Sequence, residues 1–241
     1  MDEFLAKDDI EDYCFNGLQV EGKDEVKKVV LGVTASLELF EEAVKRNGDL
    51  VLVHHGQFWS GKNPAIIDST KKRIKVLMDN DVSLYGIHLP LDRHKDVGNN
   101  AQLIKLLGGE IKDEFSFTNG KNVGWLGEFS TEKNMGEIVS VLNEKLGAKC
   151  IVLNNKESVK RFAVLSGGGT FRDFGSAVDE KVDLYITGDR GYYNEAAQEE
   201  GMNVIFVGHY PSEKLGVKAL GDVLKEKFGL EVEFVDFGHL E

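Results

Sequence analysis

Four of the six histidines in this sequence of 241 residues stand where a short apolar run ends. His54 and His55 close the run that starts at Asp49, His88 closes VSLYGIH (82–88), and His209 follows NVIFVG (203–208). Two of these histidines open the pattern His-x-Pro-x-acid, which ends in Asp92 and in Glu213. Imidazole nitrogens and carboxylate oxygens together suit zinc, iron or manganese. The pattern therefore predicts a divalent-metal site with donors among these residues.

Other candidate residues favour simpler interpretations. A lone histidine is more often a hydrogen-bonded structural residue than a ligand, and we interpret His94 and His239 in that way. The turn Ser166-Gly167-Gly168-Gly169-Thr170 follows an apolar run and could cradle a phosphate at a helix N-terminus. It lacks the lysine and the spacing of a Walker loop, so a tight packing turn is an equal alternative. Cys14 and Cys150 have neither CxxC spacing nor a nearby histidine, which predicts reduced, structural cysteines.

The elements that must position the donors alternate between two kinds of pattern. Apolar, β-branched runs predict strands, and apolar residues at helical spacing predict helices between them. This alternation is typical of an α/β fold with mainly parallel strands, whose carboxyl ends form ligand sites. The predicted strands are 28–34, 49–54, 82–88, 123–129, 150–153, 161–166, 183–187, 203–207 and 231–237.

A weak internal repeat predicts two similar lobes. Residues 28–56 and 161–189 share a strand, a small-residue turn, a helix with a central Ala-Val, and an Asp-Leu pair that opens the next strand. A third strand follows in each half and carries one copy of the His-x-Pro-x-acid pattern. A duplicated βαβαβ unit explains these features together. We expect two lobes, each a mainly parallel sheet flanked by helices, at residues 1–120 and 121–241.

Composition narrows the class of protein. The formal net charge of −12 disfavours a nucleic-acid partner, because phosphate binding depends on Lys and Arg. No run of eighteen apolar residues occurs, and the first residues, MDEFLAKDDIEDY, are acidic where a signal peptide would be basic. We therefore expect a soluble, cytoplasmic protein without a membrane partner.

Five stretches in the right order resemble the Nif-three-like family, also known as dinuclear metal-centre proteins or homologues of GTP cyclohydrolase type 2. They are NGLQVEG (16–22), DLVLVHHG (49–56), IHLPLD (87–92), DLYITGD (183–189) and GHYPSE (208–213). The resemblance implies a two-lobed α/β fold with two divalent metal ions (Zn, Fe or Mn) in the cleft between the lobes. It also implies a toroidal homohexamer built from trimers.

By the same resemblance, the metal ligands are His54, His55, Asp92, His209 and Glu213. His88 is not among the family's usual ligands, and we expect it beside the metals as a supporting group or proton carrier. One departure is visible. Many members carry Tyr-His after T-G-D, whereas this sequence has Tyr192-Tyr193, which removes a potential acid or base.

Two hypotheses of function follow from different classes. The first is a dinuclear metal-dependent hydrolase of a nucleotide-like or heterocyclic small molecule, with GTP cyclohydrolase-type activity as its most specific form and His88 or Asp189 as proton shuttles. The second is a metal-binding or metal-delivery protein without turnover. A regulatory adaptor that touches DNA is a third, which the net charge opposes.

Overall fold

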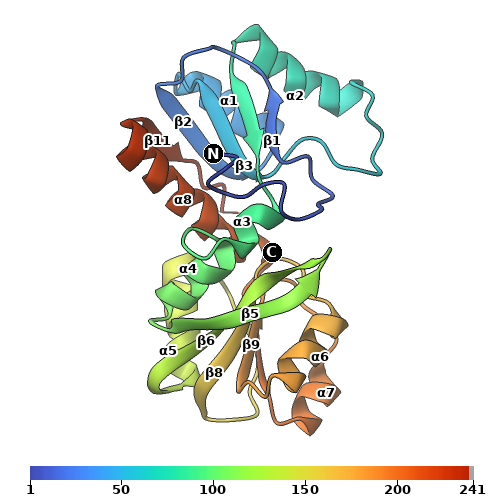
Figure 1. Ribbon diagram of the computed structural model, residues 1–241, viewed down its shortest axis with the longest axis vertical. Coiled ribbons are helices and arrows are strands. Elements are labelled where there is room, and N and C mark those ends of the chain that lie inside the picture. The colour runs from blue at the N-terminus through green and yellow to red at the C-terminus, as the bar shows by residue number, and fades with distance from the viewer. Residues whose placement is uncertain (239–241) are drawn as a thin grey trace. The chain divides into compact units, whose positions relative to one another are not determined.

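The computed structural model describes residues 1–238, and most of its helices and strands are labelled in Figure 1. The chain forms two compact units, each with its own sheet. Unit 1 comprises Met1–Leu91 and Gly216–Phe237, and unit 2 comprises Asp92–Leu215 together with Gly238. The division falls inside two helices, α3 (Leu89–Arg93) and α8 (His209–Phe228). His239 lies outside the described residues.

Unit 1 is built on a five-stranded sheet in the order β1-β4-β3-β2-β11. The strands β4, β3, β2 and β11 run parallel to one another, and β1 pairs antiparallel with β4 at the edge of the sheet. A core cluster that includes Leu39, Phe40 and Leu84 packs helices against this sheet. The elements are β1 (Gly17–Val20), β2 (Lys28–Thr34), α1 (Leu37–Lys45), β3 (Leu50–His55), α2 (Asp68–Asp79), β4 (Ser83–Gly86) and β11 (Glu231–Phe234).

Unit 2 is built on a six-stranded sheet in the order β5-β6-β8-β9-β10-β7. A core cluster of this unit includes Phe129, Leu142 and Phe162, with the two phenylalanine rings stacked 4.5 Å apart. The elements are α4 (Asn99–Leu106), β5 (Glu110–Thr118), β6 (Lys121–Asn134), α5 (Met135–Leu146), β7 (Ile151–Leu153), β8 (Ser158–Leu165), α6 (Phe171–Asp179), β9 (Leu184–Thr187), α7 (Asn194–Glu199) and β10 (Asn203–Phe206).

The predicted α/β class is confirmed, with two sheets flanked by helices. The prediction of mainly parallel strands is right for unit 1 and wrong for unit 2. In unit 2 only β8-β9 and β9-β10 are parallel, whereas β5-β6, β6-β8 and β10-β7 are antiparallel. An apolar run predicts a buried strand but does not carry its direction relative to its neighbours, and the β5-β6 hairpin accounts only for the first of these antiparallel pairs.

The predicted repeat has a structural counterpart in both units. In unit 1, β2, β3 and β4 are consecutive parallel neighbours with α1 and α2 between them in the chain. In unit 2, β8, β9 and β10 are arranged in the same way, with α6 and α7. Asp49 Oδ2 accepts hydrogen bonds from the backbone N–H groups of Lys27 and Lys28 at 3.0 Å.

Asp183 Oδ2 accepts the same two bonds from Lys160 and Arg161, also at 3.0 Å. The two aspartates therefore fasten equivalent strand starts. These aspartates are the first residues of the Asp-Leu pairs in the predicted repeat.

Two strands were not predicted. Strand β5 has the pattern EIKDEFSFT, in which five of the nine residues are exposed, and β1 is only four residues long with Leu18 57% exposed. The turn between β5 and β6 is Asn119-Gly120, and both residues have positive φ (48° and 85°). An Asn-Gly pair between alternating apolar residues is a strong hairpin signal. The Asn119-Gly120 pair is therefore the sequence signal for this hairpin.

Candidate functional site

The histidines of unit 1 meet where two parallel strands end. Strand β3 ends in His54 and His55, and its neighbour β4 leads into His88. The ring centroids of His54 and His55 lie 4.7 Å apart, and the ring centroid of His88 lies 5.1 Å from that of His54 and 5.5 Å from that of His55. One ring nitrogen of each histidine lies within 4.8 Å of the others, which is close enough for the three residues to hold one metal ion. The structure thus brings these three predicted residues together.

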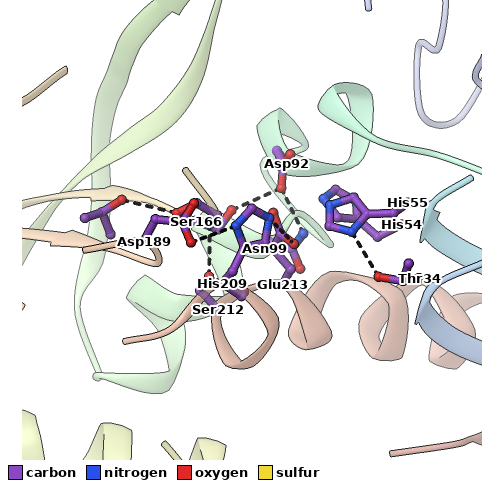
Figure 2. A network of polar contacts seen from close by, with 12 residues as sticks. Thr34, His54, His55, Asp92, Asn99, Ser166, Asp189, His209, Ser212 and Glu213 are labelled. Carbon is purple, nitrogen blue, oxygen red and sulfur yellow. Dashed lines mark hydrogen bonds and ion pairs between the residues drawn. The ribbon is translucent and has the colours of Figure 1, made fainter. Parts of the chain in front are cut away.

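Hydrogen bonds at Nδ1 orient the rings. His54 Nδ1 donates to the carbonyl oxygen of Ile87 at 2.9 Å, which fixes the tautomer because a carbonyl can only accept. His55 Nδ1 bonds Thr34 Oγ1 at 3.1 Å, as Figure 2 shows. When Nδ1 is engaged by a protein group, metal coordination uses Nε2, and such partners hold the ring in place for a metal. The donor set of unit 1 therefore fits a divalent ion.

No turn separates the adjacent histidines. Both belong to β3, and His55 O accepts a hydrogen bond from Ala35 N at 2.8 Å. Gly56 has no positive φ, but the absence of a side chain leaves room for a neighbouring residue. A Cβ at this position would clash with the side-chain amide of Gln19. Gln19 Oε1 in turn accepts a hydrogen bond from Gln57 N at 2.7 Å, so this glycine lets the N-terminal segment pack under the histidine strand.

His88 is held by a residue that sequence reasoning missed. Its Nδ1 lies 2.8 Å from Asp12 Oδ1, and Asp12 also accepts hydrogen bonds from Asn16 Nδ2 at 2.9 Å and from the backbone N–H of Leu89 at 2.9 Å. Burial alone would raise the pKa of Asp12, but its bonds to His88 and the other donors lower it to about 2. Asp12 thus stays ionised and orients the His88 ring. No motif marks it, because 76 residues separate the pair.

Trp59 is a second residue that the sequence analysis missed. Its ring stands edge-on to His88 with centroids 5.1 Å apart, and it lies 5.9 Å from His55. Its indole Nε1 donates to Gly56 O at 2.8 Å. The indole therefore forms an apolar wall beside the histidines. The nearby aromatic pair Phe58-Trp59, after HHG, was the available signal.

In unit 2, His209 and Glu213 occupy the first turns of α8. His209 Nε2 lies 3.2 Å from Glu213 Oε2, and His209 Nδ1 lies 2.9 Å from Asp189 Oδ1 (Figure 2). Two ligands of one tetrahedral ion at bond lengths of about 2 Å lie about 3.4 Å apart, so the first pair fits a shared ion. The hydrogen bond with Glu213, reinforced by Asp189, raises the pKa of His209 to about 9. The metal-free ring is therefore protonated at neutral pH, and a metal would replace that proton.

A glycine makes room for this carboxylate. Gly167 has φ +64°, and a Cβ built on it would come closer than 3.0 Å to Glu213 Oε1. Its backbone N–H donates to Ser212 Oγ at 2.9 Å, which ties the turn to α8. The turn 166–170 thus packs against the helix that carries the site. Gly169 has the same role, since a Cβ there would clash with Tyr185. These contacts support the packing-turn interpretation over a phosphate cradle.

Asp92 is oriented by two residues of unit 2. Its Oδ1 accepts hydrogen bonds from Asn99 Nδ2 at 2.8 Å and from Ser166 Oγ at 3.1 Å (Figure 2). Asn100 Nδ2 donates to the Asp92 backbone carbonyl at 3.2 Å. The residue is 5% exposed, as befits a carboxylate aimed by its neighbours and not solvated as a surface charge.

Two side chains in the sequence analysis turn out to be structural. Tyr193, where many family members carry His, is 3% exposed and stacks on Phe174 at 4.9 Å. Its hydroxyl donates to Gly169 O at 2.7 Å. His94 Nδ1 accepts hydrogen bonds from the backbone N–H groups of Asp96 and Val97, as expected for a structural histidine. These bonds hold both side chains against neighbouring backbone groups.

Known proteins resemble this chain over nearly its whole length. Residues 1–239 match the model of the Duf34/NIF3 (NGG1p interacting factor 3) family. This chain belongs to the Duf34/NIF3 family. Relatives named "GTP cyclohydrolase 1 type 2 homolog" include one from Archaeoglobus fulgidus, 41% identical with 98% of this chain and 94% of that protein covered. Another, from Pyrococcus horikoshii, is 43% identical with the same coverage.

Solved structures of the NIF3 superfamily resemble the chain as well. "Protein ybgI, unknown function" is 40% identical with a TM-score of 0.91, and covers 99% of this chain and 95% of its own. The protein TTHA1606 from Thermus thermophilus is 34% identical with a TM-score of 0.84 and the same coverage. "Reduced HcgD from Methanocaldococcus jannaschii" is 28% identical with a TM-score of 0.81, covering 98% of this chain and 94% of its own. The predicted family and fold are thus confirmed.

A search of residues 1–238 finds no helix with the length and apolar character needed to cross a membrane.

Proposed function

We propose that this NIF3-family protein binds two divalent metal ions and uses them to hydrolyse a nucleotide-like or heterocyclic small molecule. The five proposed metal ligands are His54, His55, Asp92, His209 and Glu213. The observation that carries the proposal is the orientation of the histidines, each of which has Nδ1 engaged by a protein group. Rings held in this way are typical of metal-ligating histidines.

The carboxylates support the same proposal. Glu213 already lies at ligand-to-ligand distance from His209, and Asp92 is aimed by two hydrogen bonds to one of its oxygens. Ions bound by such donors lower the pKa of a bound water and polarise the bond that is cleaved. The names of the curated relatives, homologues of a GTP cyclohydrolase, point to a nucleotide as the substrate class.

The remaining polar residues would manage protons. His88 holds its Nδ1 against ionised Asp12, so Nε2 is the atom at which it would exchange a proton. A carboxylate behind a histidine stabilises the imidazolium that forms when the ring accepts a proton. Asp189 orients His209 and has half of its side chain exposed, so it would pass a proton to solvent.

The hydrolase test compares the wild type with His54→Ala and His209→Ala on a panel of nucleotides and cyclic metabolites. Both variants should lose the hydrolysis that the wild type shows, with the fold retained by circular dichroism. The matched control is His94→Ala, because His94 Nδ1 accepts two backbone hydrogen bonds and the residue is not among the proposed ligands. His88→Ala should lower kcat by about 10² to 10⁴ without removing metal.

The alternatives give different results in the same set of variants. Metal exchange without turnover of any compound would favour a metal-delivery protein. Salt-sensitive binding to single-stranded DNA that survives both histidine substitutions would favour a regulatory adaptor. Loss of hydrolysis in His94→Ala to the same extent as in His54→Ala would contradict the assignment of the site.

A toroidal homohexamer in the cytoplasm remains part of the proposal, on the basis of the family resemblance. Light scattering coupled to gel filtration should give about six times the 26.8 kDa of one chain. A monomer at micromolar concentration would contradict it.

A further inference from the structure

Unit 2 contains a cavity of about 420 Å³, within the range of small-molecule sites. It is formed by the segments that follow β9 and β10, by the first turns of α8, and by residues 146–151 between α5 and β7. Since β9 and β10 are parallel neighbours, the cavity lies at the carboxyl ends of parallel strands, where α/β proteins bind ligands. The metal ligands proposed above do not line it, so it is a separate feature.

The lining of this cavity is cationic. Lys149, Arg190 and Lys214 line it, together with Asp189 as the one acid among the described lining residues. The whole chain carries 41 acidic and 29 basic residues, so the local excess of cations runs against its composition. Lys214 is only 8% exposed, which is unusual for a lysine, and its Nζ lies 5.9 Å from the Tyr210 ring centroid. Such a cluster of cations suits an anionic ligand.

The helix that borders the cavity adds to this field. Tyr210, Pro211 and Lys214 all lie in the first turns of α8, a helix of 20 residues. The N-terminus of a helix carries a partial positive charge that favours phosphate groups. Helix dipole and cationic side chains therefore act on the same space.

The rest of the lining is apolar, and one acid joins the cavity to the candidate site. Ile151, Tyr210 and Pro211 offer an apolar wall. Asp189 lines the cavity and binds His209 Nδ1 through Oδ1 at 2.9 Å. A ligand in the cavity would thus lie next to the residue that orients a proposed metal ligand.

We propose that this cavity binds the phosphate end of a small phosphorylated molecule that has an apolar or heterocyclic part. The inference that this molecule is the substrate rests on the proposed hydrolase function. Phosphate binding as such needs only Lys149, Arg190, Lys214 and the start of α8.

The test uses inorganic pyrophosphate as the probe, titrated calorimetrically into the full-length protein as purified. Arg190→Ala and Lys149→Ala change exposed residues and should fold normally, and each should weaken binding about tenfold. Lys214→Met should weaken it at least as much. The matched control is Lys225→Ala, which removes one exposed lysine from the same helix outside the cavity and should leave binding unchanged.

The variant His54→Ala distinguishes pyrophosphate that binds to metal ions from pyrophosphate that binds in the cavity. This variant should retain pyrophosphate binding, because His54 does not line the cavity. Binding that is lost in His54→Ala and retained in Arg190→Ala and Lys149→Ala would place the anion elsewhere and overturn the proposal. No binding by the wild type at millimolar probe would overturn it as well. Binding by the wild type without any hydrolysis of nucleotides would refute the proposed function and leave the cavity assignment standing.

Discussion

The contact between Gly167 and Glu213 can be tested with a single methyl group. Gly167→Ala has two costs, since φ at this position is +64° and the new Cβ would come closer than 3.0 Å to Glu213 Oε1. The backbone cost of a left-handed alanine is about 1–2 kcal/mol. Overpacking adds about 1–3 kcal/mol. We expect a loss of unfolding free energy of about 2–5 kcal/mol, the sum of these two costs.

The same methyl group should act on the metal. To restore normal contact, the Glu213 carboxylate must withdraw by about 1 Å, which is half of a metal–oxygen bond of about 2 Å. Its pairing with His209 Nε2 at 3.2 Å would then be lost. Gly167→Ala should therefore weaken divalent-metal binding at least tenfold, in line with the effect of disturbing a ligand's surroundings, which is about 10–100-fold.

Gly201→Ala is the matched control for this prediction. Gly201 has nearly the same φ, +60°, but a Cβ there would meet nothing within 4 Å. It should lose only the backbone cost of about 1–2 kcal/mol and keep the metal affinity of the wild type. Urea denaturation measures stability, and titration with Zn²⁺ against a competing chelator measures affinity. If Gly167→Ala binds Zn²⁺ as tightly as Gly201→Ala, the argument that Glu213 is a ligand fails.

Three further predictions follow from the same contacts. The pKa of Asp12 is about 2 in the fold, against an ordinary value of 3.8. The ionised carboxylate therefore contributes about 2 kcal/mol of stability above pH 3.8, and this contribution is lost as pH falls through 2. Asp12→Asn should remove that dependence in acid denaturation, and an unchanged acid transition would count against the His88 pair. The pKa of His209 is raised to about 9, so the stability that this group gives to the metal-free protein is present below pH 6.5 and is lost as pH rises through 9. Over the same pH interval the affinity for metal should rise. Calorimetry of Zn²⁺ binding in two buffers at pH 7.5 should detect the released proton, and a heat independent of the buffer would contradict this. Tyr193→Phe should lower the free energy of unfolding by about 1 kcal/mol, because the hydrogen bond to Gly169 O is lost, and should lower Tm by about 2–4 °C without changing kcat. A large fall in kcat would give this tyrosine a catalytic role.

The residues at strand ends could be predicted because strands with both faces buried are apolar almost throughout. The polar residues at the end of β3 and after β4, β9 and β10 therefore stand out, and they include His54, His88, Asp189 and His209. The repeat of the Asp-Leu pair supported the topology, since Asp49 and Asp183 make the same bonds. Apolar runs therefore predict best those strands whose residues are uniformly buried.

The remaining features depend on contacts that the order of residues does not carry. Asp12 lies in an acidic stretch, and only the fold brings it to His88. Strand β5 is an edge strand with mixed burial, so it lacks the apolar run that marks a strand. The direction of strands in unit 2 and the division of units within α3 and α8 also arise from tertiary packing. Local pattern predicts the elements better than it predicts how they pair.

Metal analysis of the purified protein tests the central claim most directly. Protein expressed and purified without added metal, or reloaded with Mn²⁺, should contain about two divalent ions per chain by elemental analysis. His54→Ala and His209→Ala should each lower that number, and His94→Ala should not. A well-folded wild-type protein that holds no ion or only one after reloading would contradict the assignment of these histidines and carboxylates as ligands of a dinuclear centre.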